Sequence, residues 1–455
     1  MSTKHTIAAD KFLQHSDVAE NYNHSIWMLR QKRDKQAQSV PEWEDLRQAA
    51  CDTKLYTNSH LADMLEEFER NATRNGAIVH WAKDDKEYRE IIYDLLKSHN
   101  VKNFIKSKSM LAEECHLNPY LEEKGIDVVE SDLGERILQL MKLPPSHIVM
   151  PAVHITKQQI CKLFAEQIGS DPNDNDPTYL THAMRKALRQ KFLHADAAMT
   201  GANFAVASTG EIIVCTNEGN ADMGCSQVKL QISAFGMEKI VPNRESLGIF
   251  TRLLARSGTG QPITTYTSHY SKPVKGGEYH IIIVDNGRSD ILAHPEHIKL
   301  LNCLRCGACM NTCPVYRRSG GYSYTYFIPG PIGINLGMMK DKQLFYDNMS
   351  ACSLCYSCSC VCPAKVDLAE NIYLWRQELD NFGKANTEKK IMSKGMAFLM
   401  EHPALFHIAL NQGHLLNQLP RSIVYNKMNP WGEYHEMPKF AKESFNTLWK
   451  KGKVK

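Results

Sequence analysis

Two short runs of cysteine constrain this chain more than any other feature of its sequence. The first run holds four cysteines and is followed by Pro314, and the second repeats the pattern with Pro363 in the same place. Both runs have the spacing C-x2-C-x2-C-x3-C-P, and each position of the second lies 49 residues after its counterpart. Nine of the 14 cysteines of the 455-residue chain fall between Cys303 and Cys362. Such crowding predicts a metal site, because a disulfide framework would spread its cysteines through a small secreted domain.

The spacing of each run is typical of two-cluster ferredoxins, in which the fourth cysteine of a run ligates the other cluster. We therefore predict two [4Fe–4S] clusters whose ligands cross between the runs. The first cluster is assigned to Cys303, Cys306, Cys309 and Cys362. The second cluster is assigned to Cys352, Cys355, Cys358 and Cys313.

Structural zinc is the alternative interpretation of these runs. Zinc sites usually combine two well-separated C-x2-C pairs, so three cysteines within seven residues fit zinc poorly. Cys360 stands outside the repeat and either replaces Cys358 as a ligand or is a bystander thiol. We favour the bystander, because only Cys358 keeps the repeat's spacing.

Composition and charge place the chain among ordinary globular proteins. The net charge is +4, from 54 basic and 50 acidic residues, and no concentrated basic face of the nucleic-acid-binding kind is evident. No stretch approaches eighteen uncharged apolar residues, and the N-terminus lacks a signal-peptide core, so we expect neither a membrane span nor secretion. A cytoplasmic location with reduced thiols is the default expectation.

The hydrophobic pattern predicts an α/β region followed by an all-α region. Residues 1–73 are predicted to be mostly helical, with Pro41 as a breaker and a later helix that stops at Gly76. In residues 74–290, short apolar strands alternate with amphipathic helices. The predicted strands include "AIVHW", "KNFIKSKSM", "GIDVVESD", "SHIVMPA" and "EYHIIIVDNG", and the predicted helices include "DKEYREIIYDLLKSH" and "LGERILQLM". Beyond Ala202 the predicted strands follow one another without helices, which favours a mixed sheet.

The cysteine-rich region, residues 291–385, is predicted to be a helical ferredoxin domain. We expect a helix from about Met338 and another after Pro363. The apolar face of the second helix comprises Leu368, Ile372, Trp375 and Leu379. Clusters embedded among helices indicate the helical type of ferredoxin domain rather than the small β-sheet type.

Polar residues at predicted strand ends could form a pocket in the α/β region. Lys106, Lys108 and Arg288 are candidates for binding an anionic substrate. Glu211 and Glu218 are candidates for a catalytic carboxylate, as a base or a nucleophile. Ordinary turn chemistry explains the same residues equally well.

The order of several short motifs before the cysteine runs resembles one protein family, the LutB/LldF iron–sulfur proteins of the bacterial lactate-utilisation system. The similarity extends from about residue 60 to near residue 440. It is carried by the segments "KSKSM", "PPSHIVMPAVH", "ASTGEI", "TNEGN", "MEKIVP", "LLARSGTGQ" and "VDNGRS".

This resemblance implies a LUD domain with a fold similar to the NagB/CoA-transferase group, joined to the two-cluster ferredoxin domain and a C-terminal helical segment, residues 386–455. It also implies two partner subunits, one with a cysteine-rich domain and one a small LUD protein. The three proteins together would oxidise L-lactate to pyruvate, and this chain would be the subunit that transfers electrons through its two [4Fe–4S] clusters towards the respiratory chain. The electron acceptor would lie at or near the membrane, so a peripheral position at the inner membrane face is a further expectation. The alternative to a role in electron transfer is catalysis by the LUD domain itself, either as a CoA-transferase-like enzyme or as a 2-hydroxy-acid site, with the clusters as an accessory relay.

Overall fold

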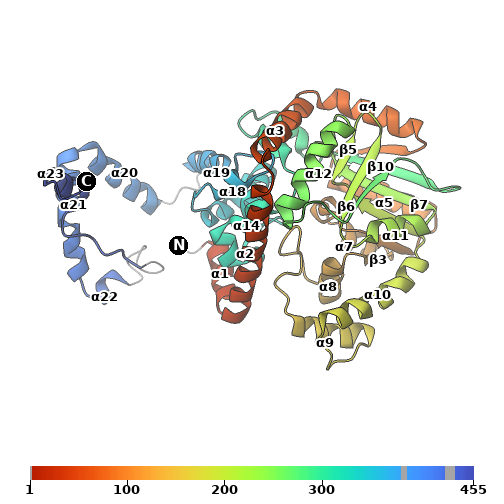
Figure 1. Ribbon diagram of the computed structural model, residues 1–455, viewed down its shortest axis with the longest axis horizontal. Helices are drawn as coiled ribbons and strands as arrows, with labels where there is room; N and C mark the ends of the chain where they lie inside the picture. Colours follow the sequence, from red (N-terminus) through yellow and green to blue (C-terminus); the bar gives the residue numbers. More distant parts are fainter. Residues whose placement is uncertain (1–2, 381–386, 426–435, 455) are drawn as a thin grey trace. The chain divides into compact units, whose positions relative to one another are not determined.

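The computed structural model describes residues 3–380, 387–425 and 436–454 (Figure 1). The chain divides into two compact units, Met1–Glu378 and Leu379–Lys455. Among the described residues, none of the helices has the length and the apolar character that crossing a membrane requires.

Four helices open the described part of the chain, and residues 1–73 were predicted to be mostly helical. Pro41 separates the second helix from the third, and the fourth ends just before Gly76, whose φ is +95°. Their bounds are α1 Lys4–Leu13, α2 Ser16–Gln38, α3 Trp43–Ser59 and α4 Leu61–Arg74. α4 packs its apolar face on the sheets through Phe68, which meets Phe235 edge to face at 5.2 Å. α2 instead lies along helices of the cysteine-rich region (Figure 1), so the N-terminal helices contact both parts of this unit.

The α/β region contains two sheets. The first has six strands in the order β1-β10-β7-β4-β2-β3, and every neighbouring pair is parallel. Its strands are β1 Ile78–Ala82, β2 Asn103–Lys106, β3 Asp127–Glu130, β4 Ala197–Gly201, β7 Leu230–Gly236 and β10 Glu278–Val284. The expectation of one mixed sheet was therefore wrong for this sheet. β4 and β7 are buried along their whole length, as expected of parallel strands covered on both faces, although β7 also carries Gln231 and Ser233.

The second sheet is smaller and mixed, in the order β8-β5-β6-β9. β6 pairs antiparallel with β5 and β9, whereas β8 pairs parallel with β5. Its strands are β5 Phe204–Val206, β6 Glu211–Thr216, β8 Ile240–Val241 and β9 Tyr266–Tyr270. A hydrophobic core fills the space between the two sheets and includes Phe235, Ile212 and Ile281. Burying each such side chain contributes roughly 1.5–3 kcal/mol.

Helices cover the parallel sheet on both faces. The helices of the α/β region as a whole are α5 Asp85–Ser98, α6 Met110–Glu114, α7 Leu117–Glu123, α8 Leu133–Met141, α9 Lys157–Ile168, α10 Pro177–Leu193, α11 Asn220–Gln227, α12 Arg244–Gly258 and α13 Arg288–Leu292, with the 3₁₀ turn η1 at Met237–Lys239. Of these, α12 packs on the small sheet. α11 lies between β6 and β7, so the expected absence of helices beyond Ala202 was wrong. The predicted strand "SHIVMPA" is also wrong, because this segment forms turns in which the His147 ring accepts hydrogen bonds from the amides of Val149 and Met150.

Within the described part of the cysteine-rich region, residues 291–380, the secondary-structure elements are all helical, as predicted. Its elements are η2 Ile298–Asn302, α14 Ala308–Thr312, α15 Pro314–Ser319, η3 Gly321–Ser323, α16 Gly330–Lys340, α17 Lys342–Phe345, η4 Tyr346–Ala351, α18 Ser357–Val361 and α19 Leu368–Gln377. The helix expected from Met338 begins at Gly330 instead, because Pro331 suits the first helical turn and the apolar segment behind it is buried. Leu368, Ile372 and Trp375 share the buried face of α19 as predicted, but Leu379 lies beyond the end of this helix.

The second unit contains short helices, α20 Thr387–Glu401, α21 Pro403–Gln412, η6 Gly413–Gln418, α22 Arg421–Val424 and α23 Phe445–Lys450. The remaining short turn, η5, spans Glu378–Asp380.

Candidate iron–sulfur centres and the adjoining pocket

The two cysteine runs repeat not only in sequence but also in backbone conformation. α14 and α18 occupy matching places 49 residues apart. Two residues after the first cysteine of each run, Arg305 and Leu354 have φ values of +58° and +54°. Two residues further on, Gly307 and Tyr356 have φ values of +80° and +59°. Each run therefore forms the same tight loop leading into a single short helix.

Backbone amides donate hydrogen bonds to cysteine sulfurs at matching positions of the two loops. The amide of Arg305 donates to Sγ of Cys303 at 3.4 Å, and the amide of Leu354 donates to Sγ of Cys352 at 3.3 Å. After the fourth cysteine of each run, the amides of Tyr316 and Val366 donate to Sγ of Cys313 and Cys362 at 3.5 and 3.3 Å, respectively. Such bonds stabilise negative charge on sulfur and tune the potential of a bound cluster.

Cys362 of the second run lies with the first three cysteines of the first run. Burial raises the pKa of Cys306 to about 12, and the nearby thiols of Cys362 and Cys303 add to the rise. Burial likewise raises the pKa of Cys362 to about 11, with Cys303 again adding to it. The pKa of Cys309 is also raised, by burial first and then by Cys303, Cys306 and Cys362 among other thiols. These three thiols and Cys309 are therefore electrostatic neighbours, which is the grouping that the crossed assignment requires.

Cys313 of the first run lies with the second run. A small cavity is lined by Cys313 together with Cys352, Cys355 and Cys358. Burial raises the pKa of Cys358 to about 12, and Cys313 is the first of the neighbouring thiols that add to the rise. Cys360 does not line this cavity and is exposed on α18.

These two groups of thiols fit a pair of [4Fe–4S] clusters by the chemistry of their donors. A [4Fe–4S] cluster takes four thiolates, and each group supplies four sulfurs. Buried thiols that raise one another's pKa values do not ionise together unless a cation compensates their charge, and iron supplies that compensation. Two arginines place positive charge beside the thiol groups. Nε of Arg47 donates a hydrogen bond to the carbonyl of Cys362 at 2.9 Å, and Nη2 of Arg376 donates one to the carbonyl of Cys352.

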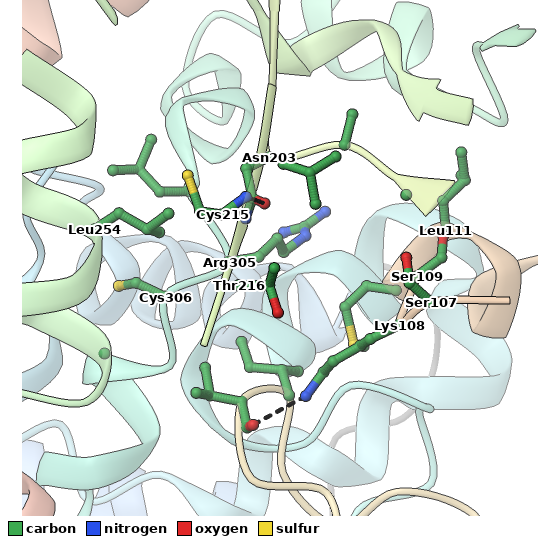
Figure 2. Close-up of a pocket in the computed structure, with 18 of the residues that line it drawn as sticks. Ser107, Lys108, Ser109, Leu111, Asn203, Cys215, Thr216, Leu254, Arg305 and Cys306 are labelled. Atoms are coloured by element: carbon green, nitrogen blue, oxygen red, sulfur yellow. Dashed lines mark hydrogen bonds between the residues drawn. The ribbon is translucent and has the colours of Figure 1, made fainter. Parts of the chain in front are cut away.

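A cavity of about 380 Å³ lies directly beside the first group (Figure 2). The cavity opens at the carboxyl ends of the neighbouring strands β2 and β4. The strand of this sheet that follows β2 in the chain is β3, on one side of the pair, and the strand that follows β4 is β7, on the other side. Ligands of open parallel sheets bind at such a switch point, outside the carboxyl ends of the strands. Figure 2 shows Cys306 and Leu254 at one end of the view and Ser107, Ser109 and Leu111 at the other. The cavity thus joins the α/β region to the loop of the first cysteine group.

Three of the five residues predicted for a pocket line this cavity: Lys108, Glu218 and Arg288. The ammonium of Lys108 donates to the carbonyl of Val149 at 2.9 Å. Burial raises the pKa of Glu218 to about 7, and the neighbouring Asp132 contributes to this rise. A carboxyl group with this pKa exchanges protons readily at neutral pH, as a general base must.

The other two predicted residues, Glu211 and Lys106, do not line the cavity. Glu211, at the start of β6, accepts a hydrogen bond from Nε of Arg244 at 2.9 Å, and this contact lowers its pKa. Lys106 is fully buried at the end of β2, where its Nζ lies 2.7 Å from Oε1 of Glu130 in the paired strand β3. Both residues are thus held in local ion pairs, and their predicted roles as a catalytic group and an anion ligand stay predictions.

Sequence reasoning missed two cations of the cavity, Lys239 and Arg305, because each becomes part of it only through the tertiary fold. Lys239 comes from η1, and Arg305 from the loop between Cys303 and Cys306. Burial lowers the pKa of Lys239 to about 8, against the opposing effect of Glu238. Nη1 of Arg305 is buried without a hydrogen-bond partner.

Arg288 is fully engaged by two buried carboxylates. Its Nη1 and Nη2 donate to the two oxygens of Glu114, each at 2.9 Å, and its Nε donates to Glu238. Burial raises the pKa of Glu238, but Arg288 and the nearby cations outweigh that effect and lower it to about 2. This arrangement leaves Arg288 little capacity for an anionic ligand and makes it a link between α6, η1 and α13.

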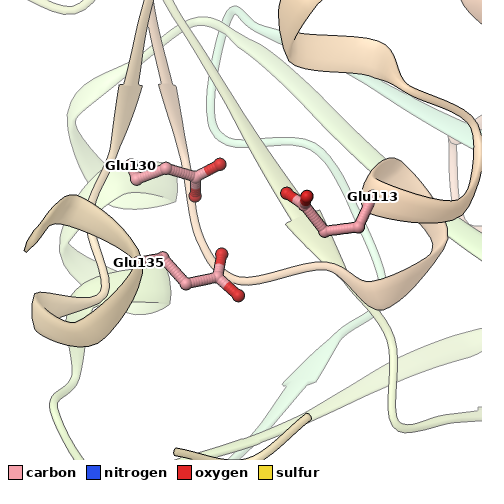
Figure 3. Close-up of side chains that lie close together, drawn as sticks. All are labelled: Glu113, Glu130 and Glu135. Carbon is pink, nitrogen blue, oxygen red and sulfur yellow. The ribbon is translucent and has the colours of Figure 1, made fainter. Parts of the chain in front are cut away.

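Three glutamates, Glu113, Glu130 and Glu135, point towards one another (Figure 3), with one carboxylate oxygen of each within 4.8 Å of the others. The ammonium of Lys106 forms ion pairs with Glu113 and Glu130. Glu135 is 6% exposed and neither of its oxygens has a hydrogen-bond partner. Burial raises its pKa well above the ordinary value, and the negative charge of Glu130 adds to the rise.

Replacing Glu135 with glutamine should make the free energy of unfolding less sensitive to rising pH. The folded chain keeps Glu135 protonated above pH 4.5, where the unfolded chain releases the proton, so this group costs stability as pH rises. The cost is at most about 1.4 kcal/mol per pH unit until the folded pKa is reached. Urea unfolding between pH 5 and pH 8 measures this effect. Glu135→Gln should gain stability relative to the wild type as pH rises, and a constant difference would show that Glu135 does not titrate in this way.

Three family models match the chain in succession. They are described as the LUD domain, over residues 65–291, the 4Fe-4S dicluster domain, over residues 299–366, and the C-terminal region of lactate utilisation protein B, over residues 378–454. The second match agrees with the cysteine pattern, and together they indicate two [4Fe–4S] clusters.

Similar proteins match along nearly their whole length. "Lactate utilization protein B" of Oceanobacillus iheyensis is 37% identical, with 97% of this chain and 94% of that protein aligned. The protein of the same name from Bacillus cytotoxicus is 39% identical, with 93% of this chain and 92% of that protein aligned. "Uncharacterized electron transport protein YkgF" of Escherichia coli is 36% identical, with 92% of this chain and 90% of that protein aligned. A crystal structure of a DUF162 family protein from Deinococcus radiodurans aligns with 49% of this chain and 98% of its own at 16% identity, but its TM-score of 0.29 supports no conclusion.

Proposed function

This chain belongs to the lactate utilization protein B family, and from that premise we propose that it is the electron-transfer subunit of a complex that oxidises L-lactate to pyruvate. The electrons would pass through two [4Fe–4S] clusters towards the respiratory chain. In this proposal the subunit is non-catalytic or co-catalytic. The name of the Escherichia coli relative, an electron transport protein, supports the same class of function.

The observation that carries this proposal is the pairing of two groups of four thiols, each assembled from both cysteine runs. A [4Fe–4S] cluster with four thiolate ligands has no open position for substrate and supplies one-electron transfer. The protein's own part is to hold the thiols, to donate amide hydrogen bonds to four sulfurs and to keep Cys306, Cys309 and Cys362 buried. Two clusters together accept the two electrons of one lactate.

The proposed partners are a cysteine-rich-domain subunit and a second small LUD-domain subunit. We also propose an electron acceptor at or near the membrane, reached from a cytoplasmic position or from the inner membrane face. The fold proposed for the LUD domain is that of the NagB/CoA-transferase group, which the six-stranded parallel sheet with helices on both faces supports.

The test is anaerobic reconstitution of this chain with the two proposed partners. Adding L-lactate should bleach the broad absorption near 400 nm that two [4Fe–4S] clusters produce, and the absorption should return when an acceptor is added. Lactate oxidation that proceeds while the clusters of this chain stay oxidised would remove the proposed role.

Catalysis by the LUD domain itself is the second candidate function, with the clusters as an accessory relay. The position of Glu218 in the cavity, with its pKa raised to about 7, favours it. In that case the isolated chain turns over lactate or an acyl-CoA, and Glu218→Gln abolishes the turnover without loss of iron. Turnover that requires the partner subunits argues for the first function.

A further inference from the structure

We propose that the cavity beside the first cysteine group binds a small organic carboxylate of the 2-hydroxy or 2-oxo acid class, with its carboxylate held by Lys239 and Arg305. The choice of acid rests on the proposed function, whereas the site itself rests on the geometry of the cavity. Neither Lys239 nor Arg305 was among the residues expected from the sequence.

The two cations are the groups of the cavity with unused capacity for an anion. The ammonium of Lys239 has no hydrogen-bond or ion-pair partner among the described residues. Arg305 lies 3.8 Å from Glu238 through Nη2, but its Nη1 is buried and unpaired. Leaving such donors unpaired is costly, and an anion that accepts their hydrogen bonds removes the cost.

The other cations near the cavity are already engaged. Arg288 binds Glu114 through both terminal nitrogens and Glu238 through Nε, and Lys108 donates to the carbonyl of Val149. These contacts restrict the anion to the part of the cavity beside the cysteine loop.

Polar groups suited to a hydroxyl or carbonyl group occupy another wall of the cavity. Asn203 accepts a hydrogen bond from the amide of Cys215 at 2.8 Å through its side-chain oxygen, which leaves its NH₂ group without a partner among the described residues. Thr216 and Glu218 follow on β6 and its turn. Glu218 accepts from the amide of Leu133 at 3.2 Å through one oxygen, so its other oxygen is available to a ligand hydroxyl.

Apolar side chains complete the wall and suit the carbon chain of an acid. Leu254, Val214 and Met110 line the same cavity. Its volume of about 380 Å³ is within the range of sites for small organic molecules, which run from about 300 to 1,000 Å³. The cavity therefore also admits acids longer than three carbons.

Cys306 lines this cavity as well as belonging to the first thiol group, and Figure 2 shows it beside Leu254, with Arg305 and Thr216 nearer the middle of the view. A bound acid changes the charge and hydrogen bonding around the cluster that Cys306 holds. Binding should therefore alter the electron paramagnetic resonance spectrum of the first cluster in the reduced protein.

The test uses the full chain, purified without air and carrying its clusters. Titration calorimetry with L-lactate and with pyruvate should show saturable binding, and L-lactamide, which lacks the carboxylate charge, should bind at least about tenfold more weakly. Lys239→Met should weaken binding of both acids by about tenfold or more without loss of iron. The matched control is Lys86→Met, because Lys86 is an exposed lysine on α5 outside the cavity.

Three results would overturn the proposal: no saturable binding of either acid, equal affinity for lactate and lactamide, or an unchanged affinity in Lys239→Met. The midpoint potential of the first cluster provides a further check. If Lys239→Met shifts this potential and leaves the affinity unchanged, the lysine only balances the charge of the cluster. Lactate-dependent reduction of the clusters in the reconstituted complex, together with no binding by this chain, would retain the proposed function and reject the site.

Discussion

Replacing Cys306 with serine should remove about half of the iron from the chain and end electron transfer through it, while the α/β region stays folded. Cys306 belongs to a buried group of four thiols that shares no member with the second group. Serine is a poor substitute for a thiolate on iron, so the first cluster is lost and the second remains. Cys306 packs in a core that it shares with the small sheet, but further hydrophobic cores, on the helix-covered face of the parallel sheet and between the two sheets, do not include it. Iron analysis and far-UV circular dichroism measure the two effects.

The crossing of ligands between the runs makes a sharper version of this prediction. Cys362→Ser should leave the same residual paramagnetic signal as Cys306→Ser, although Cys362 belongs to the other run. Cys313→Ser should instead match Cys355→Ser. If variants of the same cysteine run share a residual signal instead, so that Cys313→Ser matches Cys306→Ser, each cluster is held within one run and the crossed assignment is wrong.

Cys360→Ser is the matched control, because Cys360 is an exposed thiol of the same region outside both groups. It should keep all the iron and the wild-type spectrum. Loss of iron in this variant would make Cys360 a ligand. Unfolding of the whole chain in Cys306→Ser would show that the cluster is required for folding as well as for electron transfer.

Replacing Arg288 with methionine should cost about 3–5 kcal/mol of unfolding free energy. The Arg288 side chain is 7% exposed, and its two partners, Glu114 and Glu238, are 12% and 3% exposed. Methionine fills much of the space but leaves two carboxylates buried without their cation. The loss should be largest at neutral pH and shrink as pH falls, because protonation neutralises the carboxylates that Arg288 keeps ionised in the wild type.

Urea unfolding, followed by far-UV circular dichroism, measures the cost. Lys191→Met provides the matched control, since Lys191 and Asp127 form an exposed ion pair worth about 0–1 kcal/mol. Adding Glu238→Gln to Arg288→Met should recover part of the stability, because it removes one of the unpaired charges. A loss equal to that of Lys191→Met would show that the buried ion pairs are dispensable.

The parts of the fold that the sequence predicted correctly have strong local signals. Alternation of short apolar strands with amphipathic helices located β1, α5, β2, β3, α8 and β10. β4 was missed because the side chains of "AAMTG" are mostly too small to read as a strand, although β4 is buried at the centre of the sheet. The segment "SHIVMPA" is apolar like a strand, but Pro144 and Pro145 directly precede it and Pro151 lies within it, each with a fixed φ angle.

The site divides in the same way. The cysteine spacing assigns the thiols to two groups, because a cluster imposes a fixed number of ligands on a short loop, and the structure brings Cys362 near Cys303 and Cys306. Lys108, Glu218 and Arg288 were predicted as pocket residues because they follow predicted strands, and all three line the cavity. Lys239 and Arg305 could not be found this way, since their common position depends on how η1 packs against the cysteine loop. Lys106 and Lys108 look alike in sequence, but only burial distinguishes the ion-paired residue from the one in the cavity.

The metal content of the full chain, purified and handled without air, tests the central claim most directly. We predict about eight irons and eight inorganic sulfides per chain, and a paramagnetic signal after reduction with dithionite. A chain that carries zinc or no metal and gives no such signal would contradict the account.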